Sequence, residues 1–276
     1  MKKQLFAAIA ALLCFLPLSA QSLKGDINED GVVDVSDVTM LVDLILNPTV
    51  PSTATNGHEY VDLGLPSRTL WATCNVGANY PQGFGDYFAW GETTGYYGGR
   101  TDCTWNTYKW CNGDEYSFTK YCGNSERGDN GFVDNLTSLE LADDAARANW
   151  GGNWRTPTPE EWEELCNPEN CTWTAYKYDN EEFNGISGYK VESNKEGYEG
   201  RFIFLPAAGS VSNSEFSATN NIGIYMSSDL ATDYQSVAHS FFFNVWAYTD
   251  PNGHDERCIG MSVRPVISYD DVSANE

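Results

Sequence analysis

One segment near the start of the chain has the residue types and spacing of a calcium-binding loop. Between residues 26 and 37, Asp or Asn stands at loop positions one, three, five, nine and twelve. Gly31 occupies position six, where such a loop turns sharply, and Val32 can offer its backbone carbonyl at position seven. Calcium takes about six to eight oxygen ligands, so this pattern predicts a bound calcium ion. The predicted ligands are Asp26, Asn28, Asp30, Val32, Asp34 and Asp37.

A helix is expected to follow this loop and to carry its last ligand. Apolar residues recur at helical spacing through residues 38–46, and Asn47-Pro48 should end the helix. Met40, Leu44 and Leu46 make this helix apolar on nearly every side. Such a helix must be covered by another domain, a second chain or a separate partner.

The stretch "GDINEDGVVDVSDVTMLVDLIL", residues 25–46, resembles one calcium repeat of a dockerin, which also has Asp at position twelve. The resemblance implies a small calcium-binding module over residues 21–46 and suggests a cohesin-like partner. Full dockerins contain two such repeats, and this chain shows no second copy. The expected cohesin docking therefore rests on a single repeat.

The first residues predict export from the cytoplasm. Lys2 and Lys3 precede an apolar run from Ala7 to Leu18, and small residues up to Ala20 form a cleavage site. We expect residues 1–20 to be a cleaved signal peptide. The predicted location is extracellular or at the cell surface, with the periplasm as an alternative. No other run is apolar enough to predict a membrane span.

Acidic residues outnumber basic ones by 39 to 16, which gives a net charge of −23. A surface this negative repels nucleic acid and anionic lipid, so neither is an expected partner. The charge suits a soluble extracellular protein that attracts cations.

Residues 47–57 are rich in Pro, Ser and Thr, and they predict a linker before a large domain over residues 58–268. Short apolar or alternating runs predict many strands there, including residues 70–76, 201–205, 240–244 and 258–267. Few helices are expected. The clearest should start at Thr158, where Pro159 and Glu161 complete a capping box, and a second should cover residues 144–148. The pattern predicts an irregular α+β domain, followed by an acidic tail at residues 269–276.

Five strings in this domain carry a second resemblance: "EYVDLGLPSRTLWATCNVGA", "GDYFAWGET", "LADDAARANWGGNWRTPTPEEWEEL", "IFLPAAG" and "MSVRPV". In this order they resemble the Fibrobacter succinogenes major paralogous domain, which is common in secreted Bacteroidetes proteins. The pattern "NWGGNWRTPT" followed by "EEW", with a terminal "SVRPV", is similar at fold level to formylglycine-generating enzymes, which implies a C-type-lectin-like fold. Neither resemblance implies a defined activity.

Cysteine and histidine positions limit the remaining chemistry. In an oxidising compartment we expect at least one disulfide, either between Cys166 and Cys171 or within the group Cys103, Cys111 and Cys122. The three histidines are widely spaced in the sequence, which predicts structural or exposed roles instead of metal binding. These are His58, His239 and His254.

Three functions remain open after this reading. The leading hypothesis is a secreted or cell-surface protein for non-catalytic binding or adhesion, with a glycan or a surface protein as ligand. An alternative is an accessory subunit docked through residues 25–46 into a polysaccharide-degrading complex. A second alternative is an uncharacterised enzyme, although no catalytic motif is present.

Aromatic residues are frequent in the stretch 84–121. They either bind sugars at the surface or, as we expect, pack under the loops.

Overall fold

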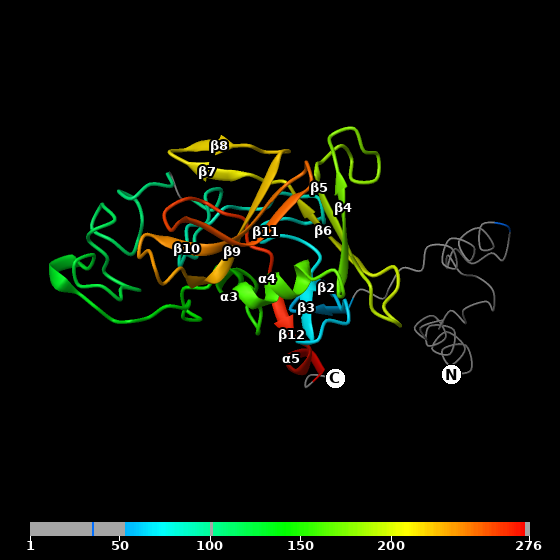
Figure 1. The fold of residues 1–276 in the computed structure, drawn as a ribbon, viewed down its shortest axis with the longest axis horizontal. Helices are drawn as coiled ribbons and strands as arrows, with labels where there is room; N and C mark the ends of the chain where they lie inside the picture. Colours follow the sequence, from blue (N-terminus) through cyan, green and yellow to red (C-terminus); the bar gives the residue numbers. More distant parts are fainter. Residues whose placement is uncertain (1–34, 36–52, 100–101, 274–276) are drawn as a thin grey trace, which may run out of the picture. The chain divides into compact units, whose positions relative to one another are not determined.

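The computed structural model describes residue 35 and residues 53–99 and 102–273 (Figure 1). The chain divides into two units, Met1–Thr49 and Val50–Glu276. Nearly all described residues belong to the second unit. The calcium loop, the helix expected at residues 38–46 and the signal peptide lie outside the described residues, so these predictions stay predictions.

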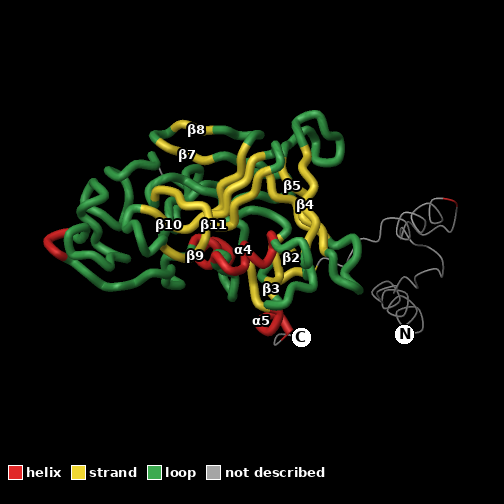
Figure 2. The backbone as a smooth tube through the Cα atoms, in the orientation of Figure 1, coloured by secondary structure: helices red, strands yellow, loops and turns green. Residues whose placement is uncertain are grey.

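The second unit is rich in β-structure, and every pairing between its strands is antiparallel. The sheets have the strand orders β1-β2-β3-β12, β11-β10-β9, β4-β5-β6 and β7-β8. Long loops join them, as Figure 2 shows. This confirms the predicted β-rich α+β class. The strands are β1 Thr53–Thr55, β2 His58–Val61, β3 Thr69–Ala72, β4 Cys171–Tyr176, β5 Gly188–Ser193, β6 Phe202–Pro206, β7 Ser210–Ser212, β8 Glu215–Ser217, β9 Ile222–Leu230, β10 Val237–Asn244, β11 Tyr248–Glu256 and β12 Val266–Ser268.

Helices are few and short in the described residues. They are the 3-10 helix η2 Asp129–Gly131 and the α-helices α3 Ala145–Trp150, α4 Pro159–Cys166 and α5 Tyr269–Ser273. The predicted start of α4 is confirmed, because Thr158 and Glu161 form a reciprocal capping box around Pro159. Asp144 caps α3 by accepting hydrogen bonds from the backbone of Ala146 and Arg147.

Aromatic side chains on α4 and the central sheet form much of the core. Trp162 of α4 stacks on Phe241 of β10, with ring centres 4.6 Å apart and 15° between the planes. The ring centre of Trp162 also lies 4.7 Å from that of Trp71 on β3. All three rings are fully buried. Burying rings of this size between a helix and two sheets is a main source of stability for a domain with so many loops.

Three boundaries differ from the sequence prediction. Thr53–Thr55, placed in the linker, forms β1 and pairs with β2, because its backbone completes the edge of that sheet. The predicted strand 258–267 is reduced to β12 and to isolated bridges, since this segment pairs with several partners in turn. The first part of the acidic tail forms α5. In addition, the strand predicted over residues 70–76 is shorter in the structure, since β3 ends at Ala72, and all four of its residues are buried.

Candidate functional site

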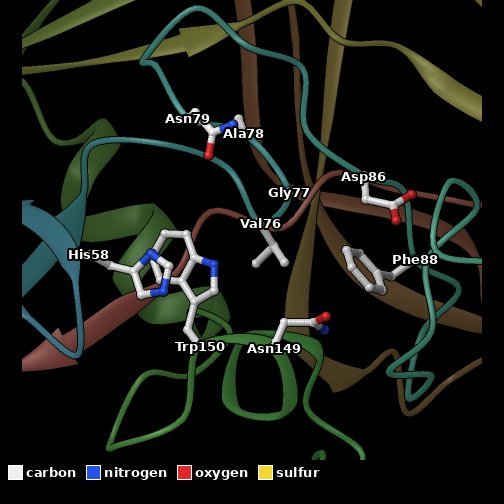
Figure 3. Close-up of a pocket in the computed structure, with 9 residues that line it drawn as sticks. All are labelled: His58, Val76, Gly77, Ala78, Asn79, Asp86, Phe88, Asn149 and Trp150. Atoms are coloured by element: carbon white, nitrogen blue, oxygen red, sulfur yellow. The ribbon is translucent and has the colours of Figure 1, made fainter.

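A pocket of about 260 Å³ opens between β2, the loop over residues 76–88 and the end of α3 (Figure 3). Its size is slightly below the range of about 300–1,000 Å³ that is typical for drug-sized ligands. The pocket therefore suits a small ligand or one unit of a longer one. Its lining residues are His58, Val76, Gly77, Ala78, Asn79, Asp86, Phe88, Asn149 and Trp150.

One wall of the pocket is a stacked pair of rings. The imidazole of His58 lies parallel to the indole of Trp150, with ring centres 3.8 Å apart and 3° between the planes. Trp150 is buried and meets Trp154 edge to face at 5.1 Å, so the hydrophobic core holds it in place. Burial lowers the pKa of His58, so its imidazole is neutral near pH 7. The wall is thus an uncharged aromatic surface.

Asp86 brings a carboxylate to the opposite side, but the fold uses this group as a support. Its Oδ1 accepts hydrogen bonds from the backbone N–H of Tyr87 at 2.8 Å and of Tyr97 at 2.7 Å. Its Oδ2 accepts one from Gly98 at 2.9 Å. The carboxylate also packs so closely on Gly95 that a Cβ there would lie 2.3 Å from its Cγ. Asp86 therefore fixes the loop 95–98 beside the pocket.

Two asparagines supply amide groups at the rim. Figure 3 shows Asn79 on the loop and Asn149 on α3 facing the space from opposite sides, with Val76 and Phe88 between them. The Nδ2 of Asn149 donates to the carbonyls of Thr93 and Ala145, at 3.1 and 2.8 Å. Both asparagines are exposed. Amides around an apolar floor can hydrogen-bond the hydroxyl groups of a neutral ligand.

An exposed aromatic surface adjoins the pocket. Tyr97, whose backbone is held by Asp86, keeps 66% of its surface exposed. Its ring lies near-parallel to that of Phe216 on β8, with ring centres 5.7 Å apart and 21° between the planes. The expectation that rings of the stretch 84–121 pack under loops is confirmed for the buried Tyr108, but it is wrong for Tyr97.

Three residues of the strings quoted from the sequence hold the fold together. Arg155 and Glu161, both in the string around "NWRTPTPEEW", form a two-pronged ion pair at 2.7 and 2.6 Å. Arg264, in "MSVRPV", is fully buried and donates to Asn75 Oδ1 and to three backbone carbonyls. Sequence reasoning missed the buried Arg264, because only the fold shows which acceptors surround it. These three residues therefore have structural roles in the described fold.

The expected disulfides are not formed, and this prediction is wrong for the structure. Cys166 and Cys171 are free thiols, and so are Cys111 and Cys122. Burial raises the pKa of both Cys166 and Cys171 to about 12. Because the thiolate is the reactive form, burial keeps these two side chains protonated and slow to oxidise.

The six predicted calcium ligands, from Asp26 to Asp37, lie outside the described residues. Within residues 53–99 and 102–273, no group of three or more His, Cys, Asp or Glu side chains is arranged to hold a metal ion. No helix among the described residues has the length and apolar character needed to cross a membrane. No family model, no curated protein and no solved structure matches this chain.

Proposed function

We propose that this protein is a secreted or cell-surface binding or adhesion protein without catalytic activity, and that its pocket holds one unit of a glycan. The observation that carries the proposal is the lining of the pocket. Stacked aromatic rings form one wall, and neutral amides stand at the rim. A sugar ring presents apolar C–H faces and hydroxyl edges, and this lining offers a partner to each.

The arrangement of the carboxylate supports binding over catalysis. General acid–base chemistry needs a side chain that can exchange a proton with the substrate. Asp86, the carboxylate of this pocket, already accepts three backbone hydrogen bonds. Its role in supporting the loop 95–98 leaves it poorly placed to act as an acid or base.

The other parts of the proposal rest on the sequence. They are a signal peptide that ends near Ala20, a calcium ion in the loop 26–37 and a C-type-lectin-like fold for residues 58–268. The antiparallel sheets, long loops and few helices agree with that fold. In the alternative function, the calcium repeat docks the protein into a polysaccharide-degrading complex through a cohesin-like partner.

A glycan array followed by calorimetry tests the proposal. Asn79→Ala removes a rim amide. We expect it to weaken binding of the best glycan about five- to twelvefold, since a lost hydrogen bond to a ligand costs roughly 1–1.5 kcal/mol. Asn106→Ala, at an exposed asparagine outside the pocket, is the matched control. Equal affinity of the two variants would place binding elsewhere. Turnover of a glycan by the wild-type protein would favour the enzyme hypothesis.

A further inference from the structure

Two of the three histidines meet on adjacent strands, although the sequence separates them. His239 on β10 and His254 on β11 are direct partners in the antiparallel register. Their ring centres lie 4.7 Å apart, with 49° between the planes. The β10–β11 hairpin brings these two rings together, which their spacing in the sequence does not indicate.

One ring nitrogen of this pair has no partner. The Nδ1 of His239 is buried, and no hydrogen-bond partner reaches it within the part of the chain that the structure describes. Leaving a buried polar atom unpaired costs stability, and such atoms commonly mark a bound water or ion. Burial, and then the charge of His254, lower the pKa of His239. His239 is therefore neutral near pH 7, which is the form of imidazole that binds a metal.

The surroundings of the pair are acidic. Asp229 at the end of β9 and Glu160 and Glu163 on α4 act on His239 through their charges. Helix α4 packs against both β10 and β11, so its exposed carboxylates border the face that carries the histidines. Asp255, next to His254, is engaged with Ser240 at 2.6 Å. The negative charges of Asp229, Glu160 and Glu163 favour a cation beside the imidazoles.

We propose that His239 and His254 bind a zinc ion through their imidazoles. With zinc–nitrogen bonds of about 2.0–2.1 Å and a tetrahedral angle, two coordinated rings have centres roughly 5 Å apart. The observed separation of 4.7 Å is close to this value. The described residues place no third ligand at the site. Water, or a carboxylate of Asp229, Glu160 or Glu163 after a side-chain rotation, completes the coordination.

The test is a zinc titration of the purified protein in excess calcium, followed by long-range proton–nitrogen spectra of the imidazole rings. Zinc should change the chemical shift of one ring nitrogen in His239 and of one in His254. The signals of His58 serve as an internal reference. Calorimetry should show that His254→Asn weakens zinc binding at least tenfold. Asn252→Ala, at an exposed position on the same strand, should leave it unchanged.

Two results would overturn the proposal. One is zinc binding that leaves the chemical shifts of the His239 and His254 ring nitrogens unchanged. This result would place the ion on thiols or carboxylates. The other is an absence of zinc binding at micromolar to millimolar concentrations. Binding should also weaken as the pH falls, because protons compete with the metal ion for the imidazole nitrogens. His254 is exposed, so its variant is expected to fold.

Discussion

Replacing Glu161 by Gln tests whether the "NWRTPTPEEW" motif is structural. The carboxylate of Glu161 binds both terminal nitrogens of Arg155, and it accepts hydrogen bonds from the Thr69 hydroxyl at 2.7 Å and the Thr158 backbone at 2.9 Å. The change to Gln keeps the size of the side chain but removes its charge. Arg155, which is mostly buried, then lacks the negative charge of Glu161. The contacts that hold α4 to the β3 sheet should therefore weaken.

The expected cost follows from these contacts. Removing one partner of a buried ion pair costs about 3–5 kcal/mol. The Arg155 side chain is 33% exposed, and Gln can keep part of the hydrogen bonding, so we expect about 2 kcal/mol here. For a domain of this size, that loss lowers the melting temperature by about 4–8 °C.

The stability that Glu161→Gln removes should also depend on pH. Burial raises the pKa of Glu161, but the hydrogen bonds and charge of Arg155 outweigh burial and hold the pKa below its ordinary value of 4.5. A carboxyl group with a lowered pKa stabilises the fold above its unfolded pKa, and this stabilisation fades as the pH falls through the folded pKa. The difference between wild type and variant should therefore be constant above about pH 5 and shrink below about pH 4.5.

Urea unfolding from pH 3.5 to pH 7 measures both effects. Glu163→Gln, at an exposed position on the same helix, is the control and should change stability by less than about 0.5 kcal/mol. Two results would refute the structural role of the ion pair. One is equal stability of the two variants at pH 7, and the other is a stability difference between Glu161→Gln and wild type that does not change with pH.

Three other changes test separate parts of the structure. Arg264→Met removes the donor to four acceptors, three of them buried, and should cost about 3 kcal/mol or more in urea unfolding. Arg68→Met, at an exposed ion pair, is the control and should cost under about 1 kcal/mol. Gly95→Ala puts a Cβ 2.3 Å from the Asp86 carboxylate, so thermal unfolding should show a loss of about 1–3 kcal/mol and calorimetry a weaker glycan affinity. Asp30→Ala, or a calcium chelator, should abolish hydrogen-exchange protection of residues 38–46 and leave residues 58–268 unchanged; equal protection with and without calcium would contradict the predicted loop.

The sequence predicted elements whose signals are local. The start of α4 was readable because Thr158, Pro159 and Glu161 act within a single turn. Strand β11 was not predicted, because it is a polar edge strand containing Pro251 and its backbone bonds to β10 define it. The pocket was missed for a similar reason. It joins β2, the loop 76–88 and α3, which only the tertiary fold brings together.

The most direct test of the proposed function is a chemical-shift map of the labelled protein with the best glycan from the array. We predict that the largest shifts fall on the pocket, at the side chains of Val76, Asn79, Asn149 and Trp150, with smaller shifts at Tyr97 on the adjoining surface. The proposed glycan binding would be contradicted if the shifts were confined to residues outside the pocket and the signals of these side chains did not change at saturation.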